Sequence, residues 1–166
     1  FPSGVVEVRL EGQVVGTARY TMVVVPVSDL HISLTWNTPN DPDETNTGNN
    51  AGSDLDLHVL RTDLGGTWFD ITHDTFWDSP SSGAPGAPQR PSLDRDDTDG
   101  AGPENANLAS LSGATYAVGV HYWDDHDFGS SFATVRIYLR GQLVEEWSHV
   151  ELEHRDFWHS HNIDAD

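Results

Sequence analysis

The sequence predicts an all-β protein, an antiparallel β-sandwich of the jelly-roll or immunoglobulin-like type with long acidic loops. Alternation of apolar and polar residues recurs at short intervals along the chain, and helix periodicity is weak almost everywhere. Turn-forming glycine, proline, asparagine and aspartate separate the alternating segments. Short strands joined by turns, with no helix required, are typical of a sandwich of about eight to ten strands.

The N-terminal part of the chain predicts a hairpin within residues 1–27. Residues 5–10 alternate, Glu11-Gly12 is a turn signal, and residues 13–27 are rich in β-branched side chains. Residues 30–36 alternate cleanly, which indicates a half-buried strand.

Residues 54–60 form the most informative predicted strand. Asp54, Asp56 and His58 point to one face, and the apolar residues that alternate with them point to the other. Two carboxylates on one face, next to the acidic loop 37–53, are suitable ligands for a cation. A solvated outer face is the alternative explanation.

The second half of the chain continues the pattern. Residues 67–77 are dense in aromatic side chains and predict a strand and turn at the sandwich edge, and residues 79–91 predict a loop. Residues 114–123 predict a strand with His121 and Trp123 on the same face.

The C-terminal strands follow from the same signals. Residues 132–139 predict a strand, Arg140-Gly141-Gln142 a tight turn, and residues 143–147 the partner strand. Residues 159–166 are expected to be frayed.

Composition excludes several functions. The chain has 27 acidic and 8 basic residues and a net charge of −19, which argues against nucleic acid or an anionic membrane as partner. It has no cysteine, so disulfides and thiolate chemistry are excluded, and it has no apolar run long enough for a membrane span. Because it begins at Phe1, we expect a mature fragment or an excised domain.

The stretch 92–105 is the strongest sign of chemistry. It contains four aspartates within six residues, followed by glycines, a proline and a glutamate. Crowded carboxylates repel one another unless water or a cation screens them, and Ca²⁺ takes about six to eight oxygen ligands. The predicted calcium ligands of this loop are Asp94, Asp96, Asp97, Asp99 and Glu104. Asp54 and Asp56, with Asp41 or Asp43, would form another site or complete the first.

Histidines allow a different metal. The chain has nine, and His58 and His121 lie on predicted strands near carboxylates, so a Zn²⁺ or Cu²⁺ site is a second hypothesis. There is no His-Glu-x-x-His motif and no recognisable pairing of a nucleophile with a base. We therefore expect a protein that is not an enzyme.

Aromatic side chains support a third hypothesis, a carbohydrate-binding module. Sugars stack on flat apolar rings, and Trp68, Trp77 and Trp123 are the candidates for ligand stacking. The alternative is that these rings pack within the sandwich or along its edge.

Four motifs in order resemble the bacterial YfaP-like domain family (the DUF2135 type). They are residues 53–59 (Ser-Asp-Leu-Asp-Leu-His-Val), 93–96 (Leu-Asp-Arg-Asp), 100–105 (Gly-Ala-Gly-Pro-Glu-Asn) and 116–120 (Tyr-Ala-Val-Gly-Val). The chain is also similar, more loosely, to the calcium-binding pre-peptidase C-terminal β-sandwiches of secreted proteases. The resemblance covers about residues 28–140 and implies a secreted or envelope module that is often appended to larger proteins.

These observations together predict one domain over residues 1–166, with the hairpin in 1–27, a YfaP-like core in 28–158 and a tail in 159–166. The expected function is that of a non-catalytic calcium-binding module, acting in binding or as a spacer. The expected location is secreted, periplasmic or on the cell surface, with a protein or a glycan as candidate partner. The sequence does not determine the oligomeric state.

Overall fold

The structure, a computed structural model, describes residues 3–10, 13–21, 28–48, 51–83, 85–87, 89–111, 113–160 and 162–163. This part of the chain contains eleven strands and no helix. The strands are β1 (Ser3–Leu10), β2 (Gln13–Thr21), β3 (Leu30–Asn37), β4 (Asp54–Arg61), β5 (Asp74–Thr75), β6 (Ser92–Leu93), β7 (Glu104–Leu108), β8 (Tyr116–Asp124), β9 (Ser131–Leu139), β10 (Gln142–Leu152) and β11 (Phe157–His159).

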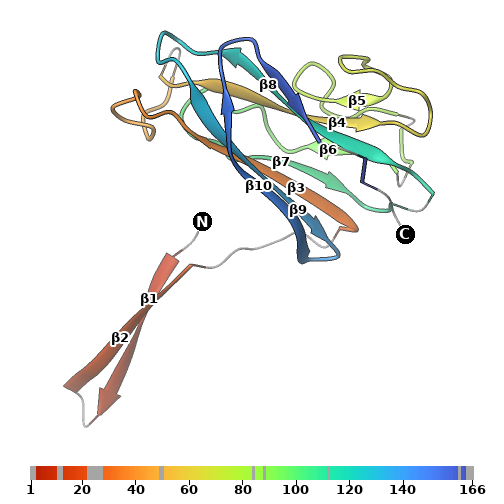
Figure 1. The fold of residues 1–166 in the computed structure, drawn as a ribbon. Coiled ribbons are helices and arrows are strands. Elements are labelled where there is room, and N and C mark those ends of the chain that lie inside the picture. The colour runs from red at the N-terminus through yellow and green to blue at the C-terminus, as the bar shows by residue number, and fades with distance from the viewer. Residues whose placement is uncertain are drawn as a thin grey trace.

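Two antiparallel sheets form the predicted sandwich (Figure 1). One has five strands in the order β10-β9-β3-β7-β6, and the other has four in the order β11-β8-β4-β5. Strands β1 and β2 pair with each other as the expected hairpin. The Glu11-Gly12 turn and residues 22–27 lie outside the described residues.

The core lies between the two sheets, as the alternation predicts. On β4, Leu55, Leu57 and Val59 are completely buried. They face apolar residues of the five-stranded sheet, such as Leu34 and Val135, within one cluster of buried side chains. Burying a side chain of this size stabilises the fold by about 1.5–3 kcal/mol.

The turn between β9 and β10 is also as predicted. Arg140 and Gly141 both have positive φ, 46° and 79°, which is the backbone geometry of a two-residue hairpin turn. Strand β10 runs on to Leu152, beyond the predicted residues 143–147.

The expectation of a half-buried strand was wrong for β3, and the solvated outer face that was the alternative for residues 54–60 is not found on β4. His31 and Ser33 on the outer face of β3 are buried, and every residue of β4 except Arg61 is buried. The outer face of β4 is covered by the aromatic segment 68–76 and by Phe157. Alternation in a sequence reports chemical contrast between two faces, and it does not show whether another segment covers the polar face.

Two segments are more ordered than predicted. Residues 104–108, of which we placed Glu104 and Asn105 in a loop, form β7 beside β3. The sequence did not indicate this strand, because Glu104, the first of its buried residues, is charged, whereas the alternation signal requires an apolar residue there. The described part of the tail that was expected to be frayed is attached to β8: the Ser160 amide donates to the Val118 carbonyl, and Ile163 bridges Tyr116. Residues 161 and 164–166 of that tail lie outside the described residues.

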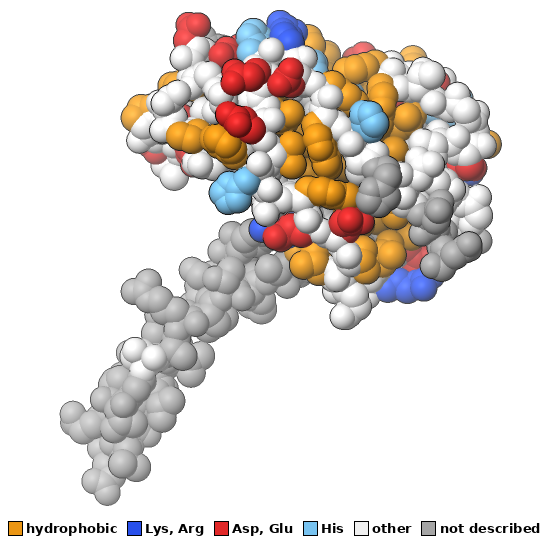
Figure 2. Space-filling view, viewed as in Figure 1, with side chains coloured by type: hydrophobic (Ala, Val, Ile, Leu, Met, Phe, Trp, Pro, Cys, Tyr) orange, Lys and Arg blue, Asp and Glu red, His pale blue; other side chains and the backbone are white. Residues whose placement is uncertain are grey.

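No helix in the described part of the chain is long and apolar enough to cross a membrane. Acidic side chains gather at the top of the view in Figure 2, near the end of the sandwich where β8 ends and the turn to β9 begins.

Candidate metal centre

The candidate site lies on the outer face of the four-stranded sheet, where β4 and β8 run antiparallel. Their register places Asp56 opposite His121 and His58 opposite Gly119. Side chains of directly opposed residues on one face are about 4.5–5.5 Å apart at Cβ. The predicted polar face of β4 therefore meets the predicted His121 face of β8.

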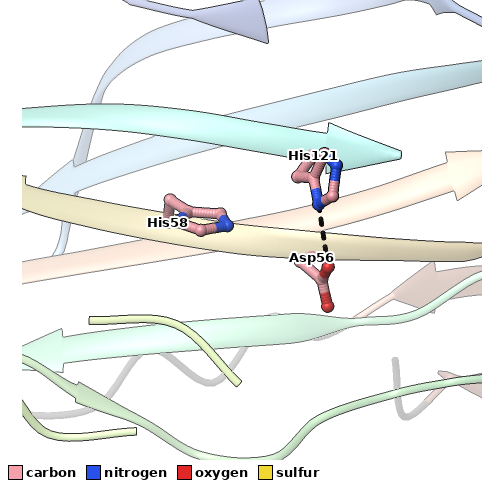
Figure 3. A group of neighbouring side chains, drawn as sticks. All are labelled: Asp56, His58 and His121. Atoms are coloured by element: carbon pink, nitrogen blue, oxygen red, sulfur yellow. Dashed lines mark ion pairs between the residues drawn. The ribbon is translucent and has the colours of Figure 1, made fainter. Parts of the chain in front are cut away.

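Asp56, His58 and His121 form a group whose ligand atoms lie within 4.8 Å of one another. All three residues are buried, with 2%, 0% and 9% of their surface exposed. Figure 3 shows one ring nitrogen of His58 pointing toward Asp56 and His121, which form an ion pair at 3.4 Å.

Each member of this group carries a buried polar atom without a hydrogen-bond partner. These atoms are Asp56 Oδ2, His58 Nε2 and His121 Nδ1. Leaving a buried polar atom unsatisfied costs about 1–3 kcal/mol, so such atoms are rare and need an explanation. Two imidazole nitrogens and a carboxylate oxygen that converge in this way are a ligand set for a transition-metal ion.

Asp74 fixes the orientation of His58. Its Oδ2 lies 2.7 Å from His58 Nδ1 and also accepts a hydrogen bond of 2.8 Å from the Phe69 amide. Asp74 is fully buried on β5, beside β4. A histidine that donates from Nδ1 to a carboxylate presents Nε2 as an acceptor for a metal, and such carboxylate partners are common behind metal ligands.

Aromatic rings enclose His58. Phe76 stacks on it at 4.9 Å, and Phe69 and Phe157 contact it edge-on at 4.7 and 5.3 Å. The glycine opposite His58 makes this possible, because a Cβ on Gly119 would lie 2.6 Å from Phe157 Cζ. The rings exclude water from this side and lower the local dielectric, which strengthens any ion–ligand interaction there.

A second group, made only of carboxylates, adjoins the first and shares Asp56. It consists of Asp54, Asp56 and Asp96. Asp54 Oδ1 is another buried atom without a hydrogen-bond partner. Burial, together with the charges of Asp56, Asp96, Asp124 and Asp97, raises the pKa of Asp54 to about 8.

The pKa of Asp96 is also raised, chiefly by burial and then by Asp56. The raised pKa values of Asp54 and Asp96 mean that their charged forms are disfavoured, and a bound cation would stabilise those charged forms.

This carboxylate group opens into a cleft of about 220 Å³ that is lined by Asp54, Asp56, Asp96, Thr98, Trp77 and Trp123. The rings of Trp77 and Trp123 lie 5.8 Å apart and are 40% and 39% exposed. Two of the three predicted stacking residues are thus at the site. The third, Trp68, packs instead against Phe157 and His159.

The other aspartates of the predicted calcium loop bind protein donors. Asp94 accepts hydrogen bonds from the backbone and side-chain amides of Asn105, Asp97 pairs with Arg95 at 2.6 Å, and Asp99 accepts from the Gly48 amide. We call a group metal-compatible when the possible ligand atoms of its residues all lie within 4.8 Å of one another. Of the four loop aspartates, only Asp96 belongs to such a group among the described residues.

Glu104, another predicted ligand, is fully buried and uses both carboxylate oxygens. Oε2 accepts from the Leu57 amide at 2.7 Å, and Oε1 accepts from the Asp97 amide at 2.9 Å. Desolvation raises its pKa well above the ordinary value. Glu104 thus ties β4 to the loop that carries Asp96, and it positions a ligand without being one of the grouped residues.

Asp41 and Asp43 shape the loop between β3 and β4. Asp41 Oδ1 accepts from the Asp43 amide, and Asp43 Oδ1 accepts from the amide and hydroxyl of Thr45. Neither belongs to a metal-compatible group within the described residues. Asp41 Oδ2 is nevertheless buried without a hydrogen-bond partner.

The sequence reasoning missed two features. Asp74 lies within the aromatic-rich segment and carries no local sign of its pairing with His58. A third group, which is partly exposed, joins Asp124 and Asp125 at the end of β8 to His154 from the segment between β10 and β11. The run Asp124-Asp125-His126-Asp127 is a signal that could have pointed to it.

No family model, no curated protein and no solved structure matches this chain. The resemblance to YfaP-like domains therefore stays a prediction.

Proposed function

We propose that this β-sandwich is a non-catalytic metal-binding module whose principal ion is a transition metal of the zinc class. Asp56, His58 and His121 would be its ligands. The observation that carries the proposal is the convergence of three buried atoms without a hydrogen bond, two of which, Asp56 Oδ2 and His121 Nδ1, face each other at 3.4 Å. Structural and catalytic zinc sites both use four-coordinate geometry, so a fourth position remains for water or another ligand.

Calcium remains the second candidate, at the adjoining group. Asp54, Asp56 and Asp96 offer only oxygen, which suits a hard cation. The raised pKa of Asp54 supports this site, because a bound cation would replace the proton that this carboxyl otherwise retains. A carboxylate has two oxygens, so Asp56 can serve both ions.

Secretion or display at the cell surface, and a role in binding or as a spacer, belong to the same proposal. A metal-stapled sandwich suits a chain without cysteines, because ion binding stabilises the folded state where disulfides are missing.

A metal-by-metal thermal shift of protein purified without a histidine tag tests the proposal. Zinc and calcium should each raise the melting temperature after treatment with EDTA, and magnesium should do so less. H121N should abolish the zinc shift and keep the calcium shift, whereas D96N should do the reverse. H154N, in the partly exposed group, is the matched control and should keep both shifts. A zinc shift that H121N leaves intact would contradict the assignment.

A further inference from the structure

We propose that the cleft beside Asp54 and Asp96 binds a neutral sugar, whose hydroxyl groups complete the coordination of a calcium ion while its ring rests against Trp77 and Trp123. This inference deepens the proposed function and rests on the carboxylate group described above.

The coordination number leaves room for a ligand. Calcium takes about six to eight oxygens, and three carboxylates rarely supply all of them. Asp54 and Asp56 are buried and line the cleft, and Asp54 Oδ1 has no hydrogen-bond partner. Asp56 would contribute its other oxygen, Oδ1, because its Oδ2 faces His121 Nδ1 at 3.4 Å in the zinc group. The free positions of an ion held there face the cleft, where adjacent hydroxyl groups of a sugar can occupy two of them.

Two tryptophan rings beside the carboxylates favour a ligand that has a flat apolar face. Trp77 and Trp123 line the same cleft as the carboxylates and are both about 40% exposed. The guanidinium of Arg155 lies over the Trp123 ring, 4.9 Å from its centroid, and the Trp77 ring lies 5.8 Å from the Trp123 ring. The indole is thereby held in place before a ligand arrives, which reduces the entropy lost on binding.

The volume of the cleft and the net charge of the protein limit the class of ligand. The cleft of about 220 Å³ is smaller than the roughly 300 Å³ at which pockets for drug-sized molecules begin, which suits a single ring of a longer chain. The net charge of −19 repels anionic ligands, so a neutral hexose fits better than a uronic acid or a sialic acid. Thr98 adds a hydroxyl group to the lining.

An array of neutral bacterial and plant oligosaccharides, probed in calcium and in EDTA, tests the inference. At least one saccharide should bind in calcium, with binding reduced at least tenfold in EDTA. W123A and W77A should each weaken that binding at least tenfold while keeping the calcium-induced thermal shift. W123F should retain part of the binding, which separates loss of the ring from loss of the fold. W147F changes a tryptophan in the other sheet and should bind like the parent.

Four outcomes would overturn the inference. In the first, calcium stabilises the protein and D96N abolishes that effect, but no saccharide binds. This result would support the calcium site and refute the sugar site. Saccharide binding that is indifferent to EDTA or to W123A and W77A would place the sugar elsewhere. Competition between choline and calcium for this cleft would show an organic-cation site. The absence of any calcium effect would remove the carboxylate site itself and this inference with it.

Discussion

Substitution of Asp74 by asparagine tests whether His58 is a metal ligand. Asparagine has the same shape, and its carbonyl can still accept from His58 Nδ1 and from the Phe69 amide, as Asp74 Oδ2 does at 2.7 and 2.8 Å. The fold should therefore survive. What is lost is the negative charge that makes the imidazole a stronger ligand, and loss of such a partner typically lowers metal affinity about 10–100-fold.

The magnitude follows from linkage. Zinc at a hundredfold excess over Kd stabilises the folded protein by about 2.7 kcal/mol. For a chain of this length that corresponds to a rise of roughly 5–10 °C in melting temperature. At the same zinc concentration, D74N should retain only about 0.4–1.4 kcal/mol, a rise of roughly 1–5 °C.

The assay is differential scanning fluorimetry in EDTA and in zinc, with affinities from calorimetry. D70N is the matched control, because Asp70 pairs with His73 at 2.6 Å in the same segment and neither belongs to a metal-compatible group in the part of the chain that the structure describes. D70N should keep the full zinc shift. An equal zinc shift in D74N and in the parent protein would refute the role of Asp74 in orienting His58.

Three further changes have expected outcomes. E104Q puts an amide nitrogen against one of the two backbone N–H donors that Glu104 now accepts from, so denaturant titration should show a loss of about 1–3 kcal/mol, and calorimetry a weaker calcium affinity. G119A places a Cβ 2.6 Å from Phe157 Cζ and should cost about 1–3 kcal/mol in the same titration, whereas an unchanged midpoint would contradict the described packing. The carboxyl of Asp54 has its pKa raised from 3.8 to about 8, so without metal the folded protein holds a proton that the unfolded chain releases. The free energy of unfolding in EDTA should thus fall as pH rises through this window, with Asp54 contributing at most about 1.4 kcal/mol per pH unit. D54N should show a shallower fall, because Asp96 and Glu104, whose pKa values are also raised, still titrate.

The strands that build the site were predictable because their two faces differ chemically. Alternation on residues 54–60 placed Asp56 and His58 on one face, and alternation on residues 114–123 placed His121 on the corresponding face of β8. Both placements are confirmed by the register of the two strands. The sequence could not show that these two strands are neighbours, because strand order depends on the packing of the whole chain.

The roles of the loop residues were harder to predict. Glu104 and Asp94 look like calcium ligands in the sequence, but their oxygens accept hydrogen bonds from backbone amides and from Asn105. Carboxylates that bind a metal and carboxylates that hold a loop have the same composition, and only tertiary contacts distinguish them. Asp74 illustrates the reverse case, because its partner His58 is sixteen residues away and adjacent only through β4–β5 pairing.

Anomalous diffraction from crystals grown with zinc, measured on both sides of the zinc absorption edge, tests the central claim most directly. We expect a peak about 2.0–2.2 Å from Asp56 Oδ2, His58 Nε2 and His121 Nδ1, with His58 Nδ1 still bonded to Asp74. Zinc found only at the partly exposed group around His154, with the three buried atoms closed onto one another or onto water, would contradict the account.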